Sequence, residues 1–323
     1  MRRLLGSLAA AGLLWAVAAC RDAEPTVSEA VMNTPVALEV IRFDRAFDQM
    51  APGELPRLKA RFPYLFPEEY PDSLWLAKQR DTLQQHLRAE VARTFPDFGP
   101  YQASLELFFK HLKYNFPEVR IPKVIALTSE VDYENRVILA DSLLLIGLDN
   151  YLGADHEFYA GLNRYIAKEL DPAYLVSDVA GTYGRKLLPY PRERSFLAQM
   201  VYHGKLLYLK DQLLPLEPDS VKIGYTGQEL AWARANEGQI WRYFIEREVL
   251  YSTDRELGPR FLDPAPFSKF QLQLDNESPG RIGRYMGWQI VRSYMDRSGA
   301  SLRELLAMPG EELFRESNYK PPK

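Results

Sequence analysis

The chain has 323 residues, of which 46% are hydrophobic and 26% are charged. This composition is typical of a globular protein and argues against wholesale disorder and against a multispanning membrane protein. The formal net charge of −3 argues against sequence-independent nucleic-acid binding, so we expect no nucleic-acid partner. The single cysteine, Cys20, excludes an internal disulfide and any multi-cysteine metal site.

The first residues are organised like a secretory leader. Met1-Arg2-Arg3 is a short basic start, and an almost entirely apolar stretch from Leu4 to Val17 follows it. That stretch is too short for a comfortable membrane span, which needs about 20 residues. Val17-Ala18-Ala19-Cys20 resembles a bacterial lipobox, in which the cysteine is lipidated and becomes the new N-terminus. The alternative is a plain signal peptide with a chance cysteine.

These features predict three segments. Residues 1–19 are expected to be a signal peptide, and Cys20, once acylated, is expected to anchor the protein in a lipid bilayer. Residues 21–35 are mostly small and polar and include two prolines, so 20–35 is interpreted as the lipidated cysteine and a flexible tether. The remaining residues, 36–323, show no repeat and no obvious linker, and they are expected to form one globular domain.

Hydrophobic periodicity predicts strands and helices in the first half of that domain. Segments rich in β-branched residues alternate with charged segments of helical period. The expected elements are a strand over 36–43, helices over 73–95 and 102–114, and strands over 121–128, 135–140 and 142–148, with the last two joined as a hairpin about Asp141.

The second half, after residue 155, is predicted to be helical. A helix within 192–213 carries Phe196, Met200, His203 and Leu207 on one stripe. Other helix starts are marked by capping boxes at Thr226 and Ser301, by Ser278 as an N-cap before Pro279, and by Pro309 before a short last helix. The sequence therefore predicts a mostly helical α+β domain with a small sheet in its N-terminal half.

Familiar catalytic motifs are absent. A zinc-peptidase helix needs a second histidine four residues after the first, but His156-Glu157 is followed by Ala160 at that place. The other histidines are His86, His111 and His203, and no two histidines are three to five residues apart. There is no nucleophile elbow and no phosphate loop. We therefore expect no catalytic residues, no cofactor and no metal.

One helix carries a candidate binding face. Arg281, Arg284, Trp288 and Arg292 are three or four residues apart over 280–297, so they share a narrow face. Arginines beside an indole can hold an anion or an acidic loop of a partner. The alternative is a stripe paired with carboxylates of the same domain. The glycines of 280–287 are interpreted as places where this helix packs closely against a neighbour.

Two weaker candidates have ordinary structural interpretations. His203 lies in the apolar stripe of its helix and is expected to be a core or boundary histidine with a partner. Asp275-Asn276-Glu277 offers three oxygen-bearing side chains, but this is far short of a calcium loop, so loop acid is the default interpretation.

Four ordered stretches carry a resemblance to a known family. They are Ile146–Gly153, Met200–Tyr208, Asn236–Ile245 and Ser278–Met295, and the chain ends with Ser317-Asn-Tyr-Lys-Pro321. Together with the lipobox, they resemble the gliding-motility lipoprotein GldB family of Bacteroidetes. The resemblance implies a cell-envelope lipoprotein connected with gliding motility and with the type IX secretion machinery of that phylum. It implies other gliding or secretion envelope proteins as partners and supplies no catalytic residues.

A fainter similarity concerns Gly283 to Val291, which looks like the C-terminal part of a family of predicted zinc peptidases. In those proteins a His-Glu-x-x-His helix precedes a Glu-Gly pair. Here the region from Leu170 to Arg194 has no histidine, and His203-Gly204 stands where Glu-Gly would be. The similarity implies a zincin-like scaffold that has lost its ligands.

Three hypotheses follow. The first is a non-catalytic, periplasm-facing lipoprotein of the motility and secretion apparatus, in the outer rather than the inner membrane. It uses the Arg281, Arg284, Trp288 and Arg292 face as a partner surface if that face is exposed. The second is a periplasmic peptide- or glycan-binding module with a deep, aromatic-lined pocket. The third is a metallopeptidase that uses His156, Glu157 and His203.

Overall fold

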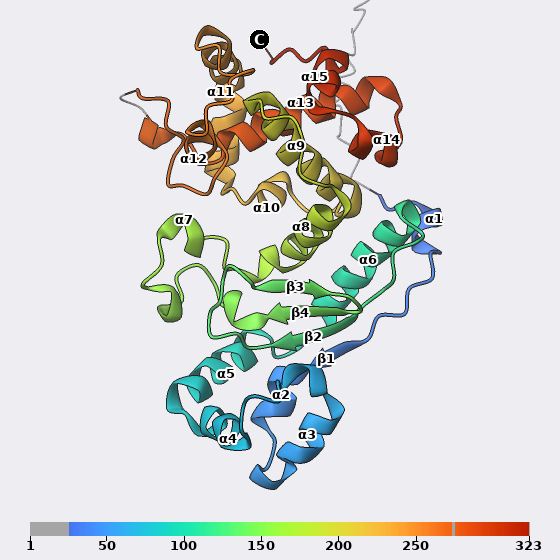
Figure 1. Cartoon of the computed structure of the whole chain (residues 1–323), viewed down its shortest axis with the longest axis vertical. Helices are drawn as coiled ribbons and strands as arrows, with labels where there is room; N and C mark the ends of the chain where they lie inside the picture. The colour runs from blue at the N-terminus through green and yellow to red at the C-terminus, as the bar shows by residue number, and fades with distance from the viewer. Residues whose placement is uncertain (1–25, 273–274, 323) are drawn as a thin grey trace, which may run out of the picture.

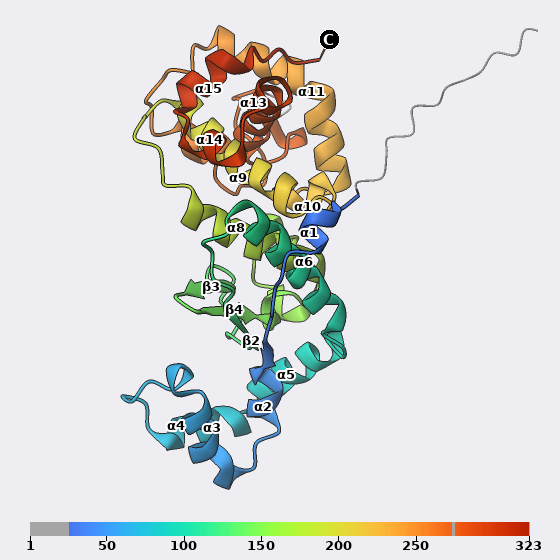
Figure 2. The same ribbon diagram turned by 90° about the vertical axis from the view of Figure 1, so that its right-hand side faces the viewer.

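The computed structural model describes residues 26–272 and 275–322, which form an elongated α+β molecule (Figure 1). A group of short helices lies at one end of the long axis, a small sheet lies in the middle, and the C-terminal helices lie at the other end. Figure 2, turned by 90°, shows the same succession. Cys20 and the predicted signal peptide lie outside the described residues.

The sheet has four strands in the order β1-β2-β4-β3. Its parallel strands are β1 (Val40–Arg42), β2 (Lys123–Leu127) and β4 (Leu143–Gly147), and β3 (Val137–Ala140) is antiparallel to β4. The predicted hairpin is confirmed, and Asp141 adopts a φ of 47° between its strands. The strand predicted over 36–43 is shorter, since only the three residues of β1 pair with β2.

Between β1 and β2 in the sequence, the chain forms the group of helices at one end of the molecule. They include α2 (Phe43–Asp48), α3 (Leu55–Arg61), α4 (Asp72–Arg80) and α5 (Thr82–Thr94). The single helix predicted over 73–95 is therefore wrong, because α4 and α5 are separate. Asp81 between them is extended, with a ψ of 129°, and its carboxylate accepts a hydrogen bond from Gln84 N at 2.9 Å. An aspartate that caps the second helix ends the first.

Beside the sheet lie α6 (Gly99–Asn115) and α8 (Leu175–Leu187), with the short α7 (Arg164–Ala167) between them in sequence. In Figure 1, α8 is on the side of the sheet that faces the C-terminal helices, and α5 is on the opposite side. The prediction of a helix over 102–114 is confirmed by α6.

The predicted tether includes ordered structure. Residues Glu29–Met32 form the short helix α1, capped by Ser28, and Val31 is buried. Lys110 of α6 donates a hydrogen bond to Met32 O at 3.0 Å. A flexible tether that extends to residue 35 is thus a wrong prediction, because the apolar side chain of Val31 gains a place in the core.

The C-terminal half is helical, as predicted. It comprises α9 (Phe196–Leu213), α10 (Asp219–Ile223), α11 (Gly227–Glu246), α12 (Leu257–Phe261), α13 (Ile282–Ser298), α14 (Leu302–Ala307) and α15 (Gly310–Ser317). The capping boxes of Thr226 and Ser301 are both formed, at the starts of α11 and α14. No described helix combines the length and the apolar character that a bilayer crossing requires.

The predicted N-cap of α13 is wrong. Ser278 is buried and bonded to Ser268, while the N-cap position is taken by Arg281 with a φ of 62° and no side-chain cap. The Ile282 N–H donates instead to Ser268 Oγ at 3.2 Å. A serine distant in sequence therefore satisfies an N–H group that a local cap would have served.

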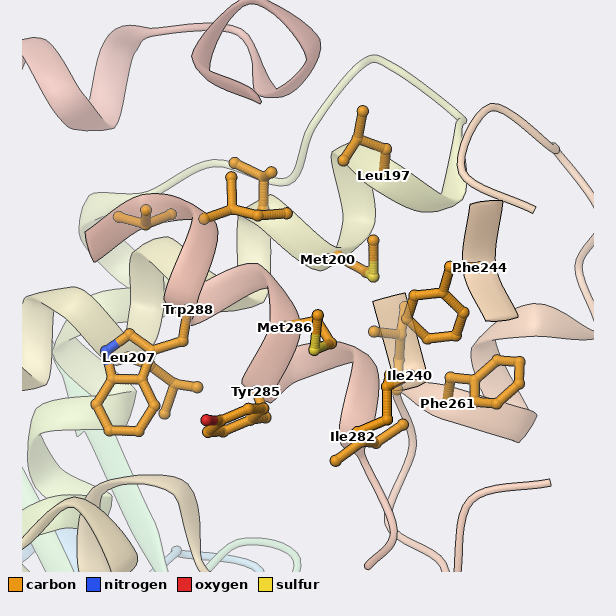
Figure 3. Packing of buried hydrophobic residues seen from close by; sticks show 14 of the residues in the cluster. Leu197, Met200, Leu207, Ile240, Phe244, Phe261, Ile282, Tyr285, Met286 and Trp288 are labelled. Carbon is orange, nitrogen blue, oxygen red and sulfur yellow. The ribbon is translucent and has the colours of Figure 1, made fainter. Parts of the chain in front are cut away.

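Helices α9 and α13 pack together in the C-terminal core, where Met200 and Met286 lie towards Phe244 and Phe261 of α11 and α12, and Trp288 lies beside Leu207 (Figure 3). The close approach expected from glycines is confirmed. A Cβ added to Gly287 would lie 1.8 Å from Met200 O, and one added to Gly204 would lie 2.2 Å from Gly287 O. Only glycine permits the two backbones to come this near.

Candidate functional site

The four residues of the predicted face do not form one exposed surface. Trp288 is 0% exposed and belongs to the core of Figure 3. Arg281 is also buried, and Arg284 and Arg292 are half-buried. Trp288 is therefore not exposed, as a partner-binding surface formed by these four residues would require. The face divides into an internal ion-paired half and a half that lines a cavity.

The first half is Arg292 and Trp288. The Arg292 guanidinium carbon lies 3.8 Å from the centre of the Trp288 ring, and its nitrogens contact Asp211 at 2.8 Å and Asp219 at 2.9 Å. Trp288 Nε1 donates to the same Asp211 at 2.8 Å. Burial would raise the pKa of Asp219, but hydrogen bonds from Arg292 and the charge of Lys222 lower it overall. This half has the paired arrangement that the sequence left open as the alternative.

The second half, Arg281 and Arg284, lines a cavity of about 470 Å³. The cavity lies where the sheet layer meets the C-terminal helices, since its walls come from α8, α9, the end of α10 and the start of α13. Its charged and polar lining side chains are Glu134, Arg136, Glu169, Tyr174, Ser177, Asp178, Thr182, Arg185, His203, Lys210, Lys222, Arg281 and Arg284.

Two carboxylates of this lining are already paired. Glu169 contacts Arg281, whose guanidinium also donates to Gly224 O at 2.9 Å. Asp178 accepts from Arg136 Nη2 at 3.0 Å and from the Tyr151 hydroxyl at 2.9 Å. These pairs join α13 to the segment after α7, and the segment before β3 to α8. They fix two walls of the cavity without neutralising its other cations.

Three cations of the lining have no carboxylate within 4.0 Å among residues 26–272 and 275–322. Arg284 donates through Nε to Leu262 O, and Lys210 Nζ donates to Ser177 Oγ and to Lys222 O, both at 2.9 Å. Arg185, which is exposed, donates to Thr182 Oγ1 at 3.0 Å. Each of these partners is neutral, so the three positive charges remain uncompensated by contact.

The pKa values of these groups follow from burial and from neighbouring charge. Burial lowers the pKa of Lys210 to about 8, against the opposing effect of Asp178 and Glu169. Burial and the nearby Arg281 lower the pKa of Arg284 to about 10. Both side chains still carry their charge at pH 7. The cavity therefore presents a positive electrostatic potential inside a partly desolvated space.

His203 also lines this cavity, on the α9 side. Burial, with the charges of Arg284 and Arg281, lowers its pKa to about 2, so the imidazole is neutral at pH 7. Its half-buried position agrees with the predicted boundary histidine, but the described residues give its imidazole no hydrogen-bond partner, which the prediction also expected. A neutral imidazole beside two arginines leaves the cavity's positive charge to the arginines and Lys210.

The residues of the metallopeptidase hypothesis are not brought together. His156 contacts Glu90 of α5 at 3.3 Å and accepts a hydrogen bond from Phe158 N, whereas His203 lies on the cavity wall. Glu157 contacts His86 at 3.5 Å. Nowhere in the described part of the chain do three His, Cys, Asp or Glu side chains converge as metal ligands.

The aromatic-lined pocket of the binding-module hypothesis has a small counterpart elsewhere. A cavity of about 220 Å³ is lined by Trp232, Tyr243 and Phe270 near the loop that holds Asp275. Asp275 accepts hydrogen bonds from Gln271 N and Leu272 N at 2.8 and 3.1 Å, so it has the loop-stabilising role of the default interpretation. The larger cation-lined cavity contains a single tyrosine, Tyr174, and is mainly charged.

Sequence reasoning missed Arg136, Arg185 and Lys210. A partial signal existed, because Lys210 lies seven residues after His203 and Arg185 lies seven after Asp178, which places each pair on one helix face. That spacing does not show that the two faces meet across a cavity.

Comparison with known proteins identifies the family of this chain. The family model described as gliding motility protein GldB matches residues 24–321. No curated protein and no solved structure matches the chain. The zincin-like scaffold expected from the fainter similarity is accordingly not supported. Since the family model covers nearly all of the sequence that follows Cys20, the chain belongs to the gliding motility protein GldB family.

Proposed function

We propose that this protein is a non-catalytic lipoprotein of the cell envelope that acts in gliding motility together with the type IX secretion machinery. The observation that carries the proposal is the family match over residues 24–321, which begins four residues after the lipobox cysteine. The predicted leader, the predicted lipidation site and the matched body of this family follow one another in the order that an anchored envelope protein needs, which supports the proposal.

The proposed anchor is acylated Cys20, in the outer membrane and facing the periplasm. The first described helix, α1, is capped by Ser28, and the segment from Cys20 to Ser28 spans at most roughly 29 Å even when fully extended. The α1–α6 side of the molecule would then lie close to the bilayer. Such a short connection favours partners that are themselves in or near the membrane, such as other gliding and secretion proteins of the envelope.

The experiment is deletion of the gene in its host, scored for colony spreading and for the secreted proteome. Complementation uses the wild-type gene and Cys20→Ala, which removes the lipidation site. We expect the deletion to abolish spreading and reduce secretion, the wild type to restore both, and Cys20→Ala to restore them poorly despite equal protein levels. Full rescue by Cys20→Ala would contradict the anchor. Normal spreading and normal secretion in the deletion strain would contradict the motility function itself.

A further inference from the structure

The cavity described above has the size of a ligand site. Its volume of about 470 Å³ lies within the range of small-molecule pockets, roughly 300–1,000 Å³. Its lining residues come from α8, from α9 and from the start of α13, so it lies between two layers of the fold. Sites between layers allow groups from distant segments to converge on one ligand.

The charges of its lining are unequal. Six Lys and Arg side chains face three carboxylates, and two of those carboxylates are held by Arg281 and Arg136. Lys222 is paired outside the cavity with Asp211 at 3.0 Å. Arg284, Lys210 and Arg185 are left without carboxylate contacts from the described residues. The third carboxylate, Glu134, is exposed at the cavity wall.

Holding such cations in a partly buried space is unfavourable unless something compensates them. A buried charge is ordinarily paired, because the loss of hydration outweighs a few hydrogen bonds to neutral groups. The Leu262 carbonyl accepts from one of the five N–H groups of Arg284, and the other four have no described protein acceptor. An ion-paired structural stripe, which explains Arg292, does not explain Arg284 and Lys210.

We propose that this cavity binds a small ligand that carries a carboxylate or phosphate group, with Arg284 and Lys210 as the principal contacts and Arg185 at the entrance. The guanidinium of Arg284 offers parallel N–H donors that match the two oxygens of an oxyanion, and Lys210 adds a compact charge from the adjacent helix α9. The Arg281–Glu169 and Arg136–Asp178 pairs hold the walls in place. This site goes beyond the proposed motility function and does not depend on it.

The test is calorimetric titration of the purified full-length lipoprotein in detergent with inorganic phosphate and, separately, with succinate. Ionic strength is kept constant with chloride, so that a general salt effect is subtracted. Phosphate represents phosphorylated ligands and succinate represents carboxylated ones. We expect one of the two to bind in a 1:1 ratio and to raise the melting temperature in a concentration-dependent manner.

Three variants locate the binding. Arg284→Gln should lower the affinity for the probe by about tenfold or more, as expected when a hydrogen bond to a charged group is lost. Arg185→Gln, at an exposed position, should lower the affinity by a smaller factor. It replaces Arg284→Gln as the test variant if Arg284→Gln does not fold. Arg255→Gln removes the same charge from an exposed position outside the cavity and should leave affinity unchanged.

The proposal is overturned if neither probe binds above the chloride control. It is equally overturned if Arg185→Gln and Arg284→Gln bind as well as Arg255→Gln does, because the anion would then occupy another surface. Because the assay uses purified protein, its failure leaves the spreading and secretion results untouched, and a failure of those leaves this assay informative.

Discussion

At the scale of one residue, the partly buried charge of Lys210 lowers the stability of the folded protein. Its ammonium group lies between Ser177 and the Lys222 carbonyl, and burial lowers its pKa to about 8. The unfolded chain, in which a lysine has a pKa near 10.5, therefore binds more protons than the folded protein between about pH 8 and pH 10.5. The contribution of this residue to the free energy of unfolding rises with pH across that window.

Replacement of this lysine by an apolar residue should stabilise the protein. We expect Lys210→Met to raise the free energy of unfolding at pH 7 by about 1 kcal/mol, because the buried charge is removed and most of the side-chain volume is kept. The gain should shrink as pH rises from 8 towards 10.5. Urea unfolding at pH 7 and at pH 9.5 measures both effects.

The matched control is Lys186→Met, at an exposed position of α8. It should change the free energy of unfolding little at either pH. A Lys210→Met protein that is less stable at pH 7 would show that the hydrogen bonds to Ser177 and Lys222 outweigh the cost of burying the charge. Lys205, whose pKa burial also lowers to about 8, is present in both proteins and so cancels in the comparison.

At the scale of elements, the pairing of α9 and α13 depends on two glycines. The added Cβ of alanine at Gly287 would meet the Met200 carbonyl oxygen at 1.8 Å, and no flexible side chain can move to relieve that contact. Alanine is favoured over glycine in an isolated helix by about 1 kcal/mol. Here the backbone clash must outweigh that preference.

We therefore expect Gly287→Ala to lower the free energy of unfolding by about 2 kcal/mol or more, as overpacked cores do. The control is Gly238→Ala in α11, where the nearest atom to the added Cβ, Pro322 O, is at an ordinary 3.6 Å. That variant should be neutral or slightly more stable. Thermal and urea unfolding of both variants measure the difference. Equal stabilities would mean that α9 and α13 separate without cost, against the close packing of the structure.

At the scale of the whole molecule, α9 connects two hydrophobic cores. Phe196, Met200 and Leu207 belong to the core of the C-terminal helices, whereas Leu209 and Leu213 belong to the core around the sheet. A helix that runs through both cores cannot lose its packing in one without exposing the other. This continuity supports the prediction of a single domain over 36–323.

One substitution in the core around the sheet should therefore lower the stability of both hydrophobic cores. Leu209 is fully buried, and Leu209→Ala should cost about 2–5 kcal/mol through the cavity it leaves. Far-UV circular dichroism follows all helices, while in a Trp75→Phe background Trp232, Trp241 and Trp288 report on the C-terminal core by fluorescence. We expect both signals to shift to the same lower midpoint.

The control is Ile138→Ala on β3, where the side chain is 42% exposed and little stability should be lost. If Leu209→Ala lowered the circular dichroism midpoint and left the fluorescence midpoint unchanged, the two cores would unfold separately. The chain would then consist of two units rather than one.

The local features of the fold could be predicted because they depend on neighbouring residues. The capping boxes at Thr226 and Ser301 and the hairpin about Asp141 are formed as expected. Each is decided within a few residues by hydrogen bonds or by turn geometry. The glycine-rich segment of α13 likewise predicted a close helix contact, although not its partner.

Two local predictions failed where a competing contact was present. Asp81 is an N-cap residue inside a charged helical pattern, and the pattern alone did not show that a second helix begins there. The proline at position 279 favours Ser278 as the cap, but Ser268 Oγ, fourteen residues before Ile282, accepts the hydrogen bond from the Ile282 N–H. At the start of α13, a contact between segments distant in sequence takes the place of the local cap for the same backbone group.

The sequence by itself predicted a lipoprotein leader, a mostly helical protein with a small sheet, and a resemblance to the gliding motility protein GldB family, because these expectations follow from composition, period and ordered motifs. Only the tertiary structure decided that Trp288 is core, that Arg292 pairs with Asp211 and Asp219, and that Arg284 and Lys210 meet at one cavity. The spacing of these residues along α13 would be the same on an exposed partner face. Whether each residue meets a carboxylate, the core or a cavity depends on how segments distant in sequence pack against α13, and hydrophobic period and residue spacing carry no information about that packing.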